Sequence, residues 1–158
     1  MGMSAYYTRI RAAVGSEVLH IPSVSVLPRD DEQRVLLVRH GDGGPWGLIG
    51  GAIEPDESPH DAARREAREE VSVEVDLTEL VGVMGGPEFR VHYANGHEVS
   101  YVSVVYNARI SSGAPTPDND EIRDVKWFGL DELDGADLDE VASATFRDLG
   151  ILLDDGSR

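Results

Sequence analysis

Three glutamates lie close together in the middle of the chain, within the run Arg65-Glu66-Ala67-Arg68-Glu69-Glu70. On an α-helix, where each residue is turned by about 100° from the last, Glu66, Glu69 and Glu70 share one arc about 100° wide. The arc borders an apolar stripe of alanine and valine on the same helix. Two carboxylates about 6 Å apart repel by roughly 3 kcal/mol at an effective dielectric near 20, and hard oxygen ligands suit Mg²⁺ or Mn²⁺. The cluster predicts a divalent-cation site, although the run also fits a solvated helix face steadied by ion pairs.

The helix that would carry these glutamates has a well-marked start. Ser58 suits the N-cap, Pro59 suits the first helical position, and Asp61 completes a start that resembles a capping box. Ahead of it, residues 46–49 form a short apolar segment that ends at Gly50-Gly51.

The rest of the chain reads as a series of strands with helices at both ends. The expected elements are a helix over 4–14, a hairpin of strands over 19–27 and 35–38, an extended segment over 71–83, a hairpin turn at Asn95-Gly96 leading to a strand over 98–110, a strand over 122–128, and helical segments over 130–133 and 141–149. We expect one α/β (α+β) domain over residues 18–153 around a mixed, largely antiparallel sheet. Residues 1–17 would be a helix and lead-in, capping a pocket or joining a homodimer, and residues 154–158 a disordered tail.

Composition narrows the classes of partner. The chain has 14 basic and 30 acidic residues, a formal charge of −16, which argues against binding a nucleic acid polymer or an anionic membrane. Without cysteine there is no disulfide, thiolate nucleophile or cysteine-based zinc site. No apolar run approaches the roughly 20 residues of a membrane helix, and the N-terminus lacks the pattern of a signal peptide. We therefore expect a cytoplasmic protein.

The acidic excess falls in two regions. Residues 51–73 hold seven acidic and three basic residues, whereas residues 118–157 hold thirteen and three. The first region contains the glutamate helix. The second region is diffuse, and its residue Glu121, which follows a proline-rich loop, fits a solvated acidic turn.

Residues 51–73 resemble the Nudix box, a pattern of Gly, Glu and Arg-Glu-apolar-x-Glu-Glu at fixed spacing. Gly51, Glu57, Arg65, Glu66, Glu69 and Glu70 are in register with it, and Ala67 and Val73 take its apolar positions. The order of elements over roughly residues 18–135 is also similar to this family. Two residues depart from the pattern: Ser72 replaces the glycine near the end of the box, and Ile49 replaces a proline before Gly50-Gly51.

The resemblance implies an α/β/α sandwich that hydrolyses the pyrophosphate bond of a nucleoside diphosphate linked to another group, with Mg²⁺ or Mn²⁺ as cofactor. It implies Glu66, Glu69 and Glu70 as metal ligands, with the Gly50 carbonyl and Glu121 as possible additions. Glu69 or Glu66 would also orient or deprotonate the attacking water. Glu57 and Arg65 would pair to hold the loop against the helix.

The substrate is less clear from the sequence. Trp46 and Tyr93, like Phe89 and Tyr101, are candidates for stacking on a base, although each also fits ordinary packing. Arg39 is a candidate phosphate or ribose contact, with a surface role as the alternative. ADP-ribose-like substrates rank slightly ahead of nucleotide sugars and nucleoside triphosphates. Two alternative hypotheses for the function are a Nudix-fold sensor that binds a nucleotide without cleaving it and a purely structural acidic domain.

Overall fold

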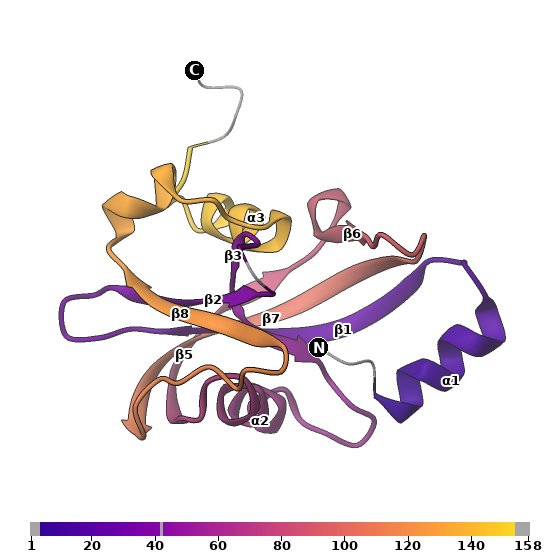
Figure 1. Ribbon diagram of the computed structural model, residues 1–158, viewed down its shortest axis with the longest axis horizontal. Coiled ribbons are helices and arrows are strands. Elements are labelled where there is room, and N and C mark those ends of the chain that lie inside the picture. Colours follow the sequence, from indigo (N-terminus) through magenta and orange to yellow (C-terminus); the bar gives the residue numbers. More distant parts are fainter. Residues whose placement is uncertain (1–3, 42, 154–158) are drawn as a thin grey trace.

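The computed structural model describes residues 4–41 and 43–153. Two sheets form a middle layer, α2 covers one side of it, α3 covers the other, and α1 lies beside it (Figure 1). In chain order the elements are α1 (Ala5–Val14), β1 (Leu19–Pro28), β2 (Val35–His40), β3 (Trp46–Gly47), β4 (Ile49–Ala52), α2 (Pro59–Val71), β5 (Glu74–Met84), the 3-10 helix η1 (Pro87–Phe89), β6 (Arg90–His92), β7 (Glu98–Ser112), β8 (Ile122–Phe128), the 3-10 helix η2 (Leu130–Gly135) and α3 (Glu140–Asp148). The expected tail, 154–158, lies outside the described residues.

The larger sheet has the order β4-β1-β7-β5, with β6 also paired to β7, and the smaller sheet has the order β3-β2-β8. Strands β1 and β7 run parallel, and the other described pairs are antiparallel. This mixed, largely antiparallel arrangement between helices confirms the expected fold class.

One predicted strand pairing is wrong. The strands over 19–27 and 35–38 were expected to form a hairpin, but β1 and β2 belong to different sheets. An isolated antiparallel bridge joins Arg29 to Val35 between the two segments. A turn between two apolar runs suggests a hairpin locally, whereas here β1 pairs with β4 and the distant β7, and β2 pairs with β3 and the distant β8. The turn at Asn95-Gly96 does join a hairpin, between β6 and β7, as predicted.

Both faces of the middle layer are buried at strand β2. In β2, Leu36 and Val38 pack in the cluster beneath α2, whereas Val35 and Leu37 pack in the cluster beneath α3. All four side chains are fully buried, and each such burial stabilises the fold by about 1.5–3 kcal/mol. This two-sided burial explains why the sequence of β2 is a continuous apolar run rather than an alternating one.

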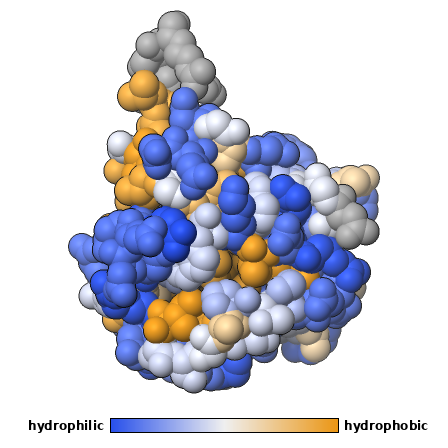
Figure 2. Space-filling view, turned by 60° about the vertical axis from the view of Figure 1, so that its left-hand side comes forward, coloured by the Kyte–Doolittle hydropathy of each residue, from blue (hydrophilic) through white to orange (hydrophobic). Residues whose placement is uncertain are grey.

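Hydrophilic residues cover most of the face shown in Figure 2, and the hydrophobic residues there are gathered in patches, some of them recessed. Within residues 4–41 and 43–153, no helix combines the length and the apolar character needed to cross a bilayer.

Candidate active site

Helix α2 fixes the position of the glutamate cluster through well-defined ends. The Ser58 hydroxyl accepts a hydrogen bond from the Asp61 amide, 3.2 Å away, and Pro59 opens the helix. At the other end Ser72 adopts a left-handed conformation with φ 58°, and its amide donates to the Arg68 carbonyl at 3.1 Å. The position where the Nudix pattern has glycine therefore does require a positive φ, and serine occupies it at a modest energetic cost.

The structure divides the predicted arc of three carboxylates between interior and solvent. Glu66 and Glu70 are 1% and 2% exposed, whereas the side chain of Glu69 is 60% exposed. Ala62 and Ala63, fully buried on the same helix, allow α2 to approach the sheet closely. Glu66 and Glu70, which the helix pattern placed at the border of the apolar stripe, thus lie inside the protein.

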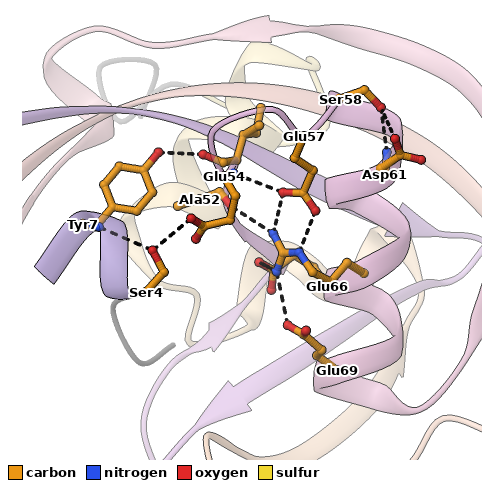
Figure 3. A network of polar contacts seen from close by, with 11 residues as sticks. Ser4, Tyr7, Ala52, Glu54, Glu57, Ser58, Asp61, Glu66 and Glu69 are labelled. Carbon is orange, nitrogen blue, oxygen red and sulfur yellow. Dashed lines mark hydrogen bonds and ion pairs between the residues drawn. The ribbon is translucent and has the colours of Figure 1, made fainter.

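Arg65 binds three of the site's carboxylates (Figure 3). Its Nε and Nη2 donate to the two oxygens of Glu57, at 2.7 and 2.9 Å. Its Nη1 donates to Glu66 at 2.7 Å and to Glu69 at 3.2 Å, and Nη2 also reaches the Ala52 carbonyl at 3.1 Å. The hydrogen bonds from Arg65 lower the pKa of Glu57. The pairing of Glu57 with Arg65, expected from the sequence, is present and ties the loop before α2 to the helix.

Glu70 is held from the other side of the site. The Gly50 amide donates to its Oε2 at 3.2 Å, while its Oε1 is buried without a hydrogen-bond partner in the structure. Burial raises the pKa of Glu70 well above its ordinary range, and the nearby charge of Glu66 raises it further. Burial also raises the pKa of Glu66, to about 7, against the opposing effect of Arg65.

These buried acids fit a divalent cation in their chemistry. A buried carboxylate oxygen without a partner is costly, and a cation beside Glu66 and Glu70 would remove both the desolvation penalty and their mutual repulsion. Within residues 4–41 and 43–153, however, no three His, Asp or Glu side chains gather in the arrangement of a metal site. Arg65 draws Glu66 and Glu69 toward itself, and the Gly50 amide engages Glu70, so the donor set fits a cation but its side chains do not converge on one point.

Glu121 lies close enough to Glu70 for its charge to raise the pKa of that residue. It precedes β8 in a turn organised by Asp118, whose Oδ1 accepts hydrogen bonds from three successive backbone amides. The Glu121 carbonyl accepts from the Gly41 amide at 3.4 Å. Glu121 therefore lies near the glutamates of α2 although it belongs to a separate loop. The sequence alone did not decide whether it would lie there.

A cleft of about 880 Å³ lies along strand β4, whose Gly50 contacts Glu70 of the glutamate helix. Strand β4 contributes Gly50, Gly51 and Ala52, and the β6–β7 hairpin contributes Tyr93 and Tyr101. Residues of β1, α1, the segment from β2 to β4 and the start of α3 also line it. The same strand that contacts Glu70 through Gly50 thus borders a cavity large enough for a nucleotide.

Gly50 has a physical reason to be glycine. Its φ is 155°, and a Cβ there would lie 2.1 Å from the Val24 carbonyl oxygen. Any side chain would push β4 away from β1 and displace the amide that binds Glu70. Glycine at position 50 is therefore required by the close approach of these two strands.

Two of the candidate substrate contacts from the sequence line this cleft. These are Tyr93 and Tyr101, whose hydroxyls lie 2.8 Å apart. Trp46 is 6% exposed and packs edge to face on Phe128, with ring centroids 5.2 Å apart. Arg39 lies over the Trp46 ring, 4.2 Å from its centroid. The structure places Trp46 in the core and Arg39 against it, so neither is among the cleft-lining residues described.

Sequence reasoning missed several residues at this site. Ser4 and Tyr7 of the N-terminal helix line the cleft, as do Glu54 and Asp139. The helix itself was predicted, with Ser4 as its N-cap, and the Ser4 hydroxyl does accept from the Tyr7 amide. Nothing in the local pattern indicated that this helix would lie against the loop before α2.

Comparison with known proteins gives a consistent result. The NUDIX domain family model matches residues 19–149. The nucleoside triphosphatase NudI of Enterobacter sp. (strain 638) is 30% identical over 112 residues, covering 69% of this chain and 79% of the relative. The protein of the same name from Escherichia coli O1:K1 / APEC is 31% identical with the same coverage.

Solved structures share the fold. A MutT NUDIX hydrolase from Burkholderia pseudomallei superposes with a TM-score of 0.66 at 27% identity, over 81% of this chain and 96% of that one. An ADP-ribose pyrophosphatase from Streptococcus suis has a TM-score of 0.64 at 22% identity, over 87% and 92% of the two chains. Fold, glutamate helix and relatives together define a hydrolase of nucleotide pyrophosphate bonds. The chain belongs to the Nudix family.

Proposed function

We propose that the protein is a Mg²⁺-dependent pyrophosphohydrolase that acts on nucleoside triphosphates. The observation that supports this most is the pair of buried glutamates, Glu66 and Glu70, one with an unpartnered oxygen, beside a nucleotide-sized cleft. Among the candidate substrates, triphosphates now rank ahead of ADP-ribose-like compounds, because the relatives at 30% and 31% identity are named nucleoside triphosphatases. The likeness to an ADP-ribose pyrophosphatase, at 22% identity, concerns the fold.

Within this proposal the metal ligands are Glu66, Glu69 and Glu70, with the Gly50 carbonyl and Glu121 as further donors. Bound Mg²⁺, or Mn²⁺ in its place, would neutralise charge on the phosphate oxygens and acidify the attacking water. Glu69, the exposed member of the cluster, orients or deprotonates that water, with Glu66 as the alternative. The water oxygen bonds to the α- or β-phosphorus and gives its proton to the glutamate. The P–O bond that bridges these two phosphorus atoms breaks, and its electron pair leaves on the departing pyrophosphate or nucleoside monophosphate.

Arg65 and Glu57 have a positioning part in this proposal. Arg65 contacts Glu57, Glu66 and Glu69 at once, so it sets the spacing of the acids on α2 relative to the loop before it. Tyr93 stacks on the base at the far side of the cleft. Arg39 and Trp46, which pair across β2 and β3, have an indirect part, in stabilising that strand pair.

The test is hydrolysis of a panel of nucleoside triphosphates, ADP-ribose and nucleotide sugars with Mg²⁺, with products separated by chromatography. We expect a nucleoside monophosphate and pyrophosphate from a triphosphate. A stable nucleotide complex without turnover, measured by calorimetry, would instead identify a sensor. The absence of any shift in thermal unfolding with Mn²⁺ would favour a purely structural domain.

A further inference from the structure

Helix α1 lies outside the segment that the family model matches, residues 19–149, yet it is firmly packed. Tyr7 is 7% exposed and lies in a hydrophobic cluster with Leu19, Ile21 and Val99. Figure 1 shows α1 beside the sheet, joined to it through the start of β1. The helix is therefore fixed relative to the strands that border the cleft.

Two side chains of this N-terminal segment hold the loop between β4 and α2. The Tyr7 hydroxyl donates to the Ile53 carbonyl at 2.6 Å, and the Ser4 hydroxyl donates to the Glu54 carboxylate at 3.0 Å (Figure 3). The Ile53 amide in turn donates to the Pro22 carbonyl at 2.9 Å. Consecutive residues of the loop are thus restrained from α1 and from β1.

The restrained loop continues directly into the glutamate site. The Glu54 amide donates to Glu57 Oε2 at 3.1 Å, and the Glu57 amide donates to the Glu54 carbonyl at 3.1 Å. Glu57 then binds Arg65 through both of its oxygens, and Arg65 contacts Glu66 and Glu69. Figure 3 shows this as one continuous series of polar contacts from α1 to α2.

We propose that α1 positions the catalytic site, with the hydroxyls of Tyr7 and Ser4 fixing Ile53 and Glu54 so that Glu57 holds Arg65 in register with Glu66 and Glu69. Tyr7 and Ser4 act through other groups and are positioning residues. The part of this proposal that concerns turnover rests on the proposed function, whereas the part that concerns the orientation of Arg65 does not.

Removal of the contacts from Tyr7 and Ser4 should lower activity by a moderate factor. Partners that orient the groups next to a metal or a reacting centre typically contribute about 10-fold or more to activity, because small displacements of those groups are costly.

Burial raises the pKa of Tyr7, and the charge of Glu54 raises it further, so this hydroxyl remains a neutral donor at physiological pH.

The main test compares Tyr7→Phe with Tyr6→Phe. Tyr7→Phe keeps the buried ring and removes only the donor to Ile53. Tyr6 is 37% exposed and touches Tyr7 edge to face, so Tyr6→Phe makes the same chemical change on the same helix. We expect Tyr7→Phe to lower kcat about 10-fold with KM within twofold of the wild type, and Tyr6→Phe to retain wild-type kinetics. A change in KM without a change in kcat would show that α1 only lines the cleft, and it would overturn the proposal.

Variants of Ser4 separate the loop contact from helix capping. Ser4→Asp keeps an acceptor for the Tyr7 amide, because aspartate is a good N-cap, but it cannot donate to Glu54 and places a like charge beside it. We expect Ser4→Asp to lower kcat without a comparable loss of thermal stability, and Ser4→Thr, which keeps the donor, to restore it. Equal kcat values in Ser4→Asp and Ser4→Thr would contradict the proposed contact.

A third measurement needs no substrate. Hydrogen exchange of the Arg65 Nε–H, observed by NMR in the metal-free protein and assigned by its loss in Arg65→Lys, reports the bond to Glu57. We expect faster exchange in Tyr7→Phe than in the wild type or Tyr6→Phe, and equal rates in all three would overturn the proposal. If no substrate is hydrolysed by the wild type, the proposed function fails and this exchange rate alone decides the positioning proposal.

Discussion

The guanidinium of Arg65 binds Glu57 through two parallel hydrogen bonds, 2.7 and 2.9 Å long, that join the helix to the loop before it. The planar fork of arginine matches a carboxylate in a way that lysine cannot. We expect Arg65→Lys to lower turnover about 10-fold and the free energy of unfolding by about 1–3 kcal/mol. Arg64→Lys, at the exposed neighbour, serves as the control and should leave both unchanged in kinetic assays and urea titrations. Wild-type turnover in Arg65→Lys would show that the paired geometry does not matter.

Glu69 provides the sharpest test of the chemistry. Because its side chain is 60% exposed, Glu69→Gln should change the free energy of unfolding by no more than about 0.5 kcal/mol. If Glu69 activates water or binds metal, turnover should fall at least about 100-fold. Steady-state rates at saturating Mg²⁺ and circular dichroism measure the two quantities, and an active Glu69→Gln protein would remove Glu69 from the mechanism.

Burial of Glu66 predicts a pH dependence of stability in the metal-free protein. Its pKa in the folded protein, about 7, lies above the ordinary glutamate value of 4.5. The folded state therefore binds the proton more tightly than the unfolded state, so the stabilisation is complete below pH 4.5 and is lost as the pH rises through about 7. The free energy of unfolding should fall by about 3 kcal/mol over this range.

The variants Glu66→Gln and Glu88→Gln separate the contribution of Glu66 to the pH dependence from the effect of the net charge of the chain. With EDTA present, urea titrations from pH 5 to 8 should give a flatter profile for Glu66→Gln than for the wild type. Glu88→Gln removes one charge at an exposed position and should keep the wild-type slope. Identical slopes for Glu66→Gln and Glu88→Gln would mean that Glu66 does not titrate differently in the folded state.

Ser72 offers a stability prediction that involves no catalysis. Its φ of 58° lies in the left-handed region, which costs a residue with a side chain roughly 1–2 kcal/mol and costs glycine much less. Allowing for the greater freedom of glycine in the unfolded chain, Ser72→Gly should raise the free energy of unfolding by about 0.5–1 kcal/mol. Ser100→Gly, within strand β7, should lower it, and thermal unfolding of both variants measures the difference.

The cleft predicts different consequences for two aromatic residues. Tyr93 is 45% exposed in the cleft, so Tyr93→Ala should raise KM about 10-fold, as expected for the loss of one stacked base, with little loss of stability. Trp46 is buried against Phe128, so Trp46→Ala should lower the free energy of unfolding by about 3–5 kcal/mol. Kinetics and denaturant titrations on both variants test the assignment of Tyr93 to substrate binding and of Trp46 to the core. The assignment is wrong if Trp46→Ala is as stable as the wild type but raises KM.

The sequence by itself determined the local features. The caps of α2, the arc of glutamates and the Asn95-Gly96 hairpin could all be predicted, because each depends on residue type and spacing within a short segment. The mixed, largely antiparallel sheet followed from the order of strands, and the pairing of Glu57 with Arg65 followed from the family resemblance. These features require no knowledge of what lies far away in the chain.

The tertiary structure decided which groups are buried and what they meet. It buried Glu66 and Glu70 while leaving Glu69 exposed, because α2 packs on the sheet through its alanines. It also separated β1 from β2, moved Trp46 into the core and placed Tyr7 on the loop before Glu57. Burial sets the pKa of a carboxylate and the partners of a hydroxyl, and it is a property of the packed molecule that no local spacing contains.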